Sequence, residues 1–165
     1  MPEHIVNTAD AEEVTHLQGR WGAHYKVLTP RSREPHGGLG LNVMRVPPGC
    51  SGVPFHWHLR EDELFYVLRG RGVLRYGDRL DEIGPGDCIS CPGGGRLAHQ
   101  IANPFDEDLV YLAVGNHDPH EVCGYPDNGK VLVRGLGQVG LLEPKPYMHG
   151  EPEVPAIFEL YEAQR

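Results

Sequence analysis

Apolar and polar positions alternate along this chain over many short stretches, and clusters of glycine and proline separate one stretch from the next. Alternation with a period of two is typical of β-strands that have one buried face. We therefore predict strands over residues 21–28, 41–46, 64–68, 72–76, 79–83, 88–91, 97–101, 109–114 and 131–133. Gly77 and Asp78 separate two of these ranges, as in a tight hairpin. Many short, evenly spaced strands favour an all-β barrel or jelly roll over alternating α/β units.

The two ends of the chain lack this regular spacing. Near the start we predict a short helix over 10–17, capped by Thr8 or Asp10, followed by a strand and a polar loop over 29–40. After residue 115 we expect a long loop, the strand over 131–133, a proline-rich passage, and an apolar end over 156–161 that docks as a strand or a helix. This divides the chain into an N-terminal extension (1–39), a barrel core (40–115) and a C-terminal extension (116–165). Because proline-rich arms gain order only through contacts elsewhere, we expect the C-terminal extension to pack on the barrel or on a second subunit.

Composition narrows the class of protein. The 165 residues suffice for one domain with a substantial core, and 22 glycines and 15 prolines suit a fold with many turns. A net charge of −8 without a cluster of Lys or Arg argues against nucleic acid or an anionic membrane as a partner. We expect no membrane span, because no apolar run approaches the required length of about 18 residues. The polar start of the chain has no signal-peptide core, so a cytoplasmic location is expected.

A reducing location affects how the cysteines are interpreted. We expect Cys50, Cys88, Cys91 and Cys123 to be free thiols. Cys88 and Cys91 have C-x-x-C spacing, but they lie in one strand-like run with no second pair elsewhere. Ordinary strand cysteines are therefore favoured over a redox or zinc site.

The segment with the clearest chemistry is 47–70. His56 and His58 are two residues apart, so on an extended backbone both imidazoles leave the same face and can share one ion. Glu63 follows after a short polar run, and Glu61 or Asp62 could supply the carboxylate instead. If Glu63 begins the next strand, Phe65 and Val67 share its face, whereas the apolar side chains at 64, 66 and 68 face the other side.

The spacing of these residues resembles the two motifs of the cupin superfamily. His56, His58, Glu63 and Gly70 follow the first motif, although Cys50 occupies its leading glycine position. The second motif is matched, with two extra residues before its histidine, by Gly86, Pro92, Gly94, His99 and Asn103. The passage over 125–130, after the barrel, looks like that of small single-domain bacterial cupins described as sugar-phosphate isomerase-like. The resemblance of the two motifs implies a cupin double-stranded β-helix, which is a jelly-roll barrel. It also implies a divalent metal with His56, His58, Glu63 and His99 as ligands.

Three imidazoles and one carboxylate suit zinc, iron, manganese, nickel or copper better than calcium or magnesium. Such a set leaves a position for water or a small molecule, so chemistry at the ion is possible. The resemblance favours a metal-dependent isomerase acting on a sugar or polyol derivative. An iron-dependent dioxygenase or other oxidoreductase and a non-catalytic small-ligand-binding protein are the alternatives, and no residue is assigned a catalytic role.

Because barrels of this type often pair exposed sheet edges, we predict a homodimer.

Other polar residues are candidates for contacts with the small molecule. Asn42, Arg45, Tyr76 and Tyr111 lie on predicted strands and could reach the cavity. An isomerase of phosphorylated sugars should place basic groups at the barrel mouth, and Arg45, Arg75 and Arg96 are the candidates. We interpret His117 and His120, with the adjoining Asp118 and Glu121, as residues of a solvated loop and not as a second site.

Overall fold

The computed structural model describes residues 5–33 and 38–165. Residues 34–37, within the predicted polar loop, lie outside the described part, as do residues 1–4 of the N-terminal extension. The strands are β1 (Glu13–Gln18), β2 (Trp21–Val27), β3 (Leu39–Val46), β4 (Trp57–His58), β5 (Glu63–Arg69), β6 (Gly72–Tyr76), β7 (Arg79–Ile83), β8 (Cys88–Cys91), β9 (His99–Ala102), β10 (Leu109–Asn116), β11 (Val122–Tyr125), β12 (Lys130–Val133) and β13 (Gln138–Leu141). The helical elements are two short 3-10 turns, η1 (Pro30–Arg33) and η2 (Arg134–Leu136), and the helix α1 (Ala156–Glu162).

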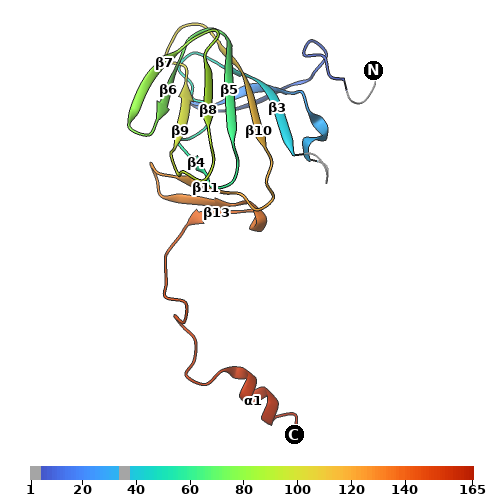
Figure 1. The fold of residues 1–165 in the computed structure, drawn as a ribbon, viewed down its shortest axis with the longest axis vertical. Helices are drawn as coiled ribbons and strands as arrows, with labels where there is room; N and C mark the ends of the chain where they lie inside the picture. Colours follow the sequence, from blue (N-terminus) through green and yellow to red (C-terminus); the bar gives the residue numbers. More distant parts are fainter. Residues whose placement is uncertain (1–4, 34–37) are drawn as a thin grey trace.

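The strands form three sheets that together make a jelly-roll barrel (Figure 1). The largest has the order β1-β2-β3-β10-β5-β8, and its neighbouring strands are antiparallel. A three-stranded sheet, β7-β6-β9, lies across the barrel from it, and a sheet of order β13-β12-β11-β4 crosses the lower end in Figure 1. The all-β prediction is confirmed.

The core fills the space between the largest sheet and the three-stranded sheet that lies across the barrel from it. The alternation predicted for β5 is confirmed: Phe65 and Val67 are 8% and 1% exposed, whereas Leu64, Tyr66 and Leu68 are 39–44% exposed. The inward side chains of β5 meet those of the other walls in one cluster that includes Val46, Leu74, Ile83, Ile89, Ile101, Leu109 and Tyr111. Burial of these side chains supplies the main driving force for closing the barrel.

The predicted helix over 10–17 is wrong. Most of this range belongs to β1, which pairs with β2 in register from Glu13↔Lys26 to Gln18↔Trp21. A tight turn at Gly19, which has a φ of 62°, joins the two strands. Capping residues favour a helix only locally, and here cross-strand pairing along the edge of the large sheet outweighs that preference.

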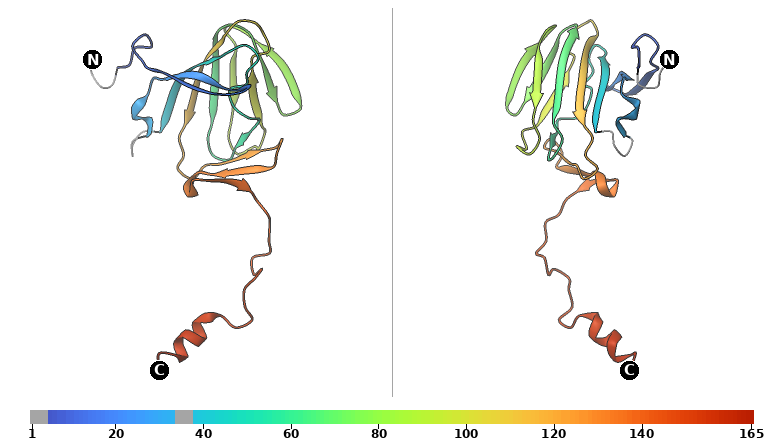
Figure 2. Two further views of the ribbon diagram at one scale, coloured as in Figure 1. Left: turned by 180° about the vertical axis from the view of Figure 1, so that it is seen from behind. Right: turned by 45° about the vertical axis from the view of Figure 1, so that its right-hand side comes forward.

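The C-terminal region contains two strands that were not predicted, β11 and β13. The expected long loop after residue 115 contains β11, which pairs with β4 through Cys123↔His58 and Gly124↔Trp57. This short ladder ties the segment after β10 to the strand that carries the paired histidines. Beyond β13 the chain runs away from the barrel and ends in α1, a helix, which was one of the two predicted forms (Figures 1 and 2). Among the described residues, no helix is long and apolar enough to cross a membrane.

Candidate metal centre

His56 and His58 enter the barrel from the segment around β4. The backbone of His56 exchanges two hydrogen bonds with His99, at 3.1 and 2.8 Å, which fixes the spacing of these two residues. His58 is held on its other side by the pairing of β4 with β11. The His56 and His58 rings lie 4.8 Å apart between centroids, and the His56 and His99 rings 4.6 Å apart. All three imidazoles are therefore neighbours, and each is 9% exposed or less.

Glu63 and His99 complete the cluster from the first positions of β5 and β9. The Oε2 atom of Glu63 lies 2.7 Å from His99 Nε2, 3.2 Å from His58 Nε2 and 3.7 Å from His56 Nε2. The two extra residues before His99 are absorbed in a turn where Gly94 and Arg96 take left-handed conformations, with φ of 82° and 51°. The structure thus brings together all four residues predicted as metal ligands, and this grouping could hold a metal ion.

The environment of His58 provides a test of whether a metal fits. His58 Nε2 is buried and has no hydrogen-bond partner among the described residues, since its contact with Glu63 lacks hydrogen-bond geometry. A buried polar atom without a partner costs about 1–3 kcal/mol, so proteins rarely retain one without a purpose. In His56, Nδ1 lies 2.9 Å from the carbonyl oxygen of Pro54, so an Nδ1–H donates to it and Nε2 keeps a free lone pair toward the cluster. Three Nε2 atoms around one carboxylate match the ligand chemistry of a divalent transition metal.

The two alternative carboxylates, those of Glu61 and Asp62, have other partners. Glu61 is 5% exposed and pairs with both terminal nitrogens of Arg134, and it also accepts the backbone N–H of Asp118 at 2.7 Å. Asp62 accepts the backbone N–H of Gly93 at 2.9 Å. Glu61 Oε2 lies 3.6 Å from His58 Nδ1, the ring nitrogen that also contacts Glu121. Among these three acidic residues, Glu63 is the one whose carboxylate reaches the Nε2 atoms of the three histidines.

Glu121 has a structural role that the sequence did not reveal. It is fully buried, so the prediction of a solvated loop is wrong for this residue. Its carboxylate accepts the backbone N–H groups of Leu59, Arg60 and Glu61 at 2.8, 3.0 and 2.7 Å. These bonds hold the turn that connects His58 to Glu63. Sequence gave no signal for them, because the partners are about 60 positions apart.

A second buried grouping shares His58 with the first. The Nδ1 atom of His58 lies 3.4 Å from Cys123 Sγ and 3.6 Å from Glu121 Oε1. These three residues could also hold an ion. However, the Glu121 oxygens are already occupied by three backbone donors, so we interpret Glu121 and Cys123 as groups that orient the His58 ring. All four cysteines are free thiols.

Burial and neighbouring charges shift the pKa values within the cluster. Burial and the nearby His99 lower the pKa of His56 to about 4. Burial also lowers the pKa of His58, but contacts with the Cys123 thiol and the Glu63 carboxylate outweigh it and raise the pKa to about 10. For Glu63, His58 and His99 outweigh burial and hold the pKa well below its usual range. At neutral pH Glu63 is therefore a carboxylate and His56 is a neutral imidazole.

A pocket of about 680 Å³ connects Glu63 to the surface. Its lining includes Asn42, Met44 and Ala113 inside the barrel and Asn116, His117 and Arg134 near the C-terminal sheet. Of the four residues predicted to contact a small molecule, Asn42 lines this pocket. Tyr111 is instead a core residue, 4% exposed and edge-on to Phe65, and Tyr76 is packed against the same core.

The three arginines expected at the barrel mouth have other contacts. Arg45 pairs with Glu13 and Asp108. Arg75 pairs with Asp127 and lies over the Phe55 ring. Arg96 lies 5.4 Å from the centroid of the Trp57 ring. None of these arginines is among the described residues that line the pocket.

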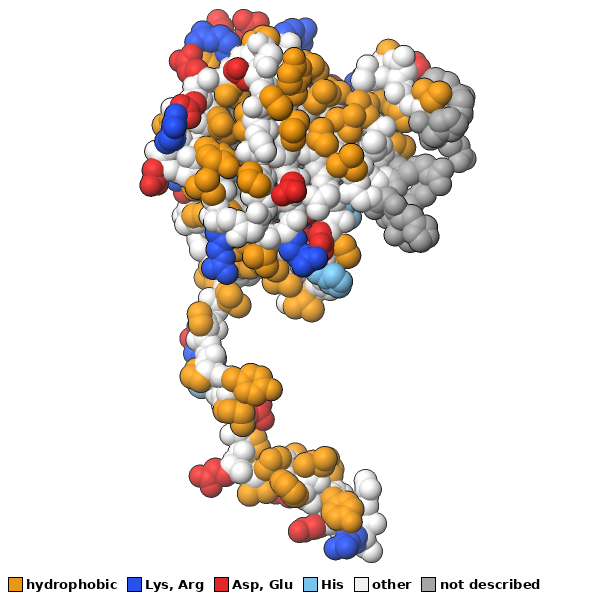
Figure 3. Space-filling model, viewed as in Figure 1, with side chains coloured by type: hydrophobic (Ala, Val, Ile, Leu, Met, Phe, Trp, Pro, Cys, Tyr) orange, Lys and Arg blue, Asp and Glu red, His pale blue; other side chains and the backbone are white. Residues whose placement is uncertain are grey.

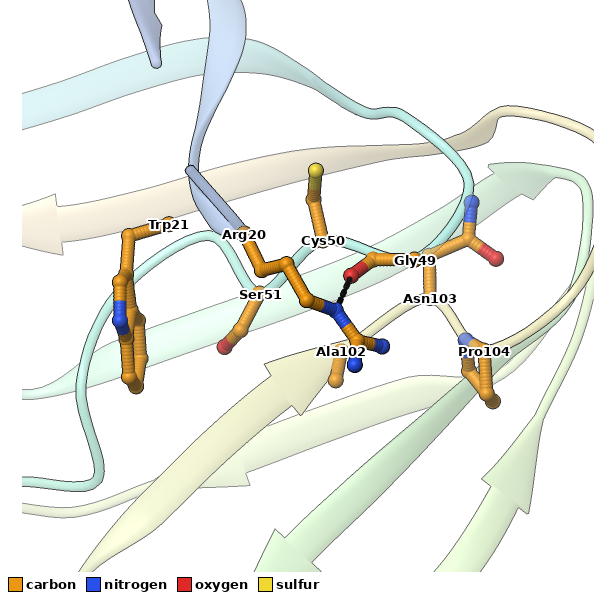
Figure 4. Close-up of a pocket in the computed structure, with 8 residues that line it drawn as sticks. All are labelled: Arg20, Trp21, Gly49, Cys50, Ser51, Ala102, Asn103 and Pro104. Carbon is orange, nitrogen blue, oxygen red and sulfur yellow. Dashed lines mark hydrogen bonds between the residues drawn. The ribbon is translucent and has the colours of Figure 1, made fainter. Parts of the chain in front are cut away.

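A second hollow, of about 340 Å³, lies at the turn between β1 and β2 and shares no residue with the cluster (Figure 4). Arg20 crosses it and donates from Nε to the carbonyl of Gly49 at 2.7 Å. The side-chain amide of Asn103 is buried and fully bonded, donating to the carbonyls of Val46 and Glu107 and accepting from Phe105 N–H. The polar groups of this hollow thus serve the fold.

Comparisons with known proteins agree with this geometry. The family described as Cupin domain matches residues 42–115. A protein named oxalate-binding protein from Thermotoga maritima is 38% identical over 116 residues, covering 68% of this chain and 84% of that protein. A putative sugar phosphate isomerase from Acidithiobacillus ferrooxidans has a similar structure, with a TM-score of 0.72 and 25% identity, covering 85% of this chain and 92% of that one. The crystal structure of a predicted oxalate decarboxylase from Thermotoga maritima aligns with a TM-score of 0.57 and 28% identity, over 68% of this chain and 97% of that chain.

Proposed function

This chain belongs to the cupin family, and we propose that it holds one divalent transition-metal ion through His56, His58, Glu63 and His99 and uses it to bind a small chelating dicarboxylate. The observation that carries the proposal is the convergence of three imidazole Nε2 atoms on Glu63. One of them, in His58, is buried and has no hydrogen-bond partner within 5–33 and 38–165. An empty cluster of this kind would leave a buried polar nitrogen without a partner.

When bound, the ion would supply a Lewis acid with positions free for oxygen ligands of a small molecule. The protein residues orient the ligating atoms. The Pro54 carbonyl fixes the His56 ring, Cys123 and Glu121 contact the far nitrogen of His58, and Glu121 also holds the turn that leads to Glu63. Contacts of this kind, made to the ligand residues and not to the ion, hold the ligating atoms in the right orientation before the ion binds.

The ligand class follows from the relative named for oxalate binding together with the pocket. Oxalate presents two oxygens that chelate one ion, which suits a site with adjacent free positions. Arg134 is the arginine among the described lining residues, and it is neutralised by Glu61, so charge on the ligand would be balanced mainly at the ion. A pocket of about 680 Å³ also leaves room for ligands larger than oxalate.

An isomerase acting on a sugar or polyol derivative is the second candidate, favoured by the similarity to the putative sugar phosphate isomerase over 85% of this chain. A phosphate group finds little support in the pocket, because Arg45, Arg75 and Arg96 all lie outside its described lining. An unphosphorylated hydroxy-acid or sugar acid would fit better, since it can chelate the ion as a dicarboxylate does.

Calorimetric titration of oxalate into the metal-loaded protein tests the proposal. We expect binding that disappears after removal of the metal and in Glu63→Gln, and that persists in the neighbouring control Asp62→Asn. Absence of oxalate binding to a fully loaded protein would refute the dicarboxylate assignment. Turnover of aldoses or sugar acids would then support the isomerase, whereas bound iron with substrate-dependent oxygen uptake would support a dioxygenase.

A further inference from the structure

The last thirty residues expose apolar side chains that a folded protein normally covers. Eleven large apolar side chains between 136 and 161 are at least 57% exposed: Leu136, Val139, Leu141, Leu142, Tyr147, Met148, Val154, Ile157, Phe158, Leu160 and Tyr161. Figure 3 shows hydrophobic side chains along the segment that leaves the barrel. We call residues 142–165 the C-terminal arm. Its seven large apolar side chains from Tyr147 onward expose on the order of 800 Å² of surface, about what one partner contributes to a standard protein interface.

The helix at the end of this arm, α1, has one apolar face. In α1 the side chains of Ile157, Phe158, Leu160 and Tyr161 share one face, and Glu159 and Glu162 lie on the opposite face. The helix has seven residues, and isolated helices shorter than about 12 residues are marginal in water. Packing of the apolar face against another surface would stabilise the helix.

The barrel presents a matching surface on the outer face of its largest sheet. The register places Leu41, Val114, Leu64 and Ser90 in one row across β3, β10, β5 and β8, and Val43, Leu112, Tyr66 and Cys88 in the next. Neither row carries a charged side chain. We call these two rows and the adjoining Leu68 the outer face; hydrophobic side chains gather there over β3, β10 and β5 in Figure 3. Exposed apolar patches of this kind mark interaction sites.

The segment between β13 and α1 favours a second molecule over the same one. It contains Pro144, Pro146, Pro152 and Pro155, and proline-rich segments act as semi-rigid extended spacers. The views in Figures 1 and 2 show it carrying α1 away from its own barrel. Two copies related by a twofold axis could each receive the arm of the other, which doubles the buried area.

We propose that the C-terminal arm of one copy docks through the apolar face of α1 on the outer face of a second copy, giving an arm-exchanged homodimer. This inference does not depend on the metal centre. In this dimer the apolar side chains of the arm and of the outer face are buried against each other, whereas in a single chain both are exposed.

Native Cys88 makes the contact testable, because it is an exposed thiol on the outer face, paired in register with Tyr66. We place a cysteine on the arm as Ile157→Cys or Tyr161→Cys, oxidise the full chain mildly, and separate it on a denaturing gel without reductant. The expected result is a covalent dimer for at least one arm position that vanishes when Cys88→Ser is added. A cross-link within one chain, or covalent dimers of the unsubstituted chain through Cys88 alone, would overturn the proposal.

Sedimentation equilibrium gives an independent readout. Phe158→Glu in the arm and Tyr66→Glu on the outer face should each raise the dimer dissociation constant at least tenfold. The matched control is Leu80→Glu, since Leu80 on β7 is an apolar side chain that is 70% exposed and lies off both surfaces. A monomeric unsubstituted chain, or equal dissociation constants for all three variants, would contradict arm exchange.

Discussion

Glu61 and Arg134 form a two-pronged ion pair across 73 positions of sequence, from the turn that joins β4 to β5 to the turn that follows β12. Arg134 also donates to the backbone carbonyl of Asp118 at 2.9 Å. The pair thereby locks the C-terminal sheet against the segment between the paired histidines and Glu63. Because Glu61 is 5% exposed, its charge depends on this partner.

Arg134→Met should therefore destabilise the fold. We expect a loss of about 2–3 kcal/mol in the free energy of unfolding, below the cost of breaking a fully buried pair because the Arg134 side chain is 28% exposed. Urea unfolding measures it, and adding Glu61→Gln should recover about half, since the stranded charge is then removed. The control Arg79→Met breaks an exposed pair with Asp81 and should cost less than about 0.5 kcal/mol. No recovery in the double variant would show that the two side chains act independently.

Glu121→Gln should weaken both the fold and metal binding. An amide in place of the carboxylate turns an NH₂ group toward backbone donors, and each stranded donor costs about 1–3 kcal/mol. We also expect a loss of about 10–100-fold in metal affinity, the usual effect of changing a group that orients a ligand. Chelator competition and urea unfolding give the two values. Glu82→Gln, on the exposed surface of β7, is the control and should change neither. Unchanged metal affinity in Glu121→Gln would contradict a role for Glu121 in orienting the metal ligands.

Gly124 allows the close approach of β11 to Trp57. A Cβ atom at Gly124 would lie 2.1 Å from the Trp57 indole, so Gly124→Ala must move the residue between His56 and His58. We expect a loss of about 1–3 kcal/mol in thermal unfolding, as for other overpacked sites, together with reduced metal content. Gly140→Ala, on β13 with open space around its Cβ position, should stay within about 0.5 kcal/mol of the unsubstituted protein. Equal effects of the two substitutions would contradict the packing argument.

Metal affinity should rise with pH. Without metal, the pKa of His58 is about 10, so this ring carries a proton at neutral pH that a metal must displace. His56, with a pKa of about 4, is already neutral and releases none. Between pH 6.5 and 9 we therefore expect an increase of about tenfold per pH unit from His58 alone. Calorimetry in buffers of different ionisation enthalpy counts the released protons. A pH-independent affinity would show that His58 is not a ligand or is neutral beforehand.

Much of the barrel was predictable because its signals are local. Alternation along 63–69 assigned the inward and outward side chains of β5, and the glycine-containing turn located the β6–β7 hairpin. The resemblance to the two cupin motifs named His56, His58, Glu63 and His99, which are the residues of the cluster that the structure assembles.

The features that the sequence did not predict have a common physical cause. Glu121 looked like a loop residue because its partners, the N–H groups of residues 59–61, are distant in sequence. The same holds for Glu61, whose partner Arg134 lies beyond β12. In β1, the local helix signal around 10–17 lost to pairing with β2. The structure of these segments thus depends on long-range hydrogen bonds and strand pairing, which local sequence preferences do not indicate.

Elemental analysis of the purified protein tests the central claim most directly. The account predicts about one transition-metal ion per chain in the unsubstituted protein after loading, its loss in His58→Ala and His99→Ala, and its retention in His16→Ala, a histidine on the exposed edge strand β1. Metal retained at the unsubstituted level in both His58→Ala and His99→Ala, or a loaded protein that binds none, would contradict it.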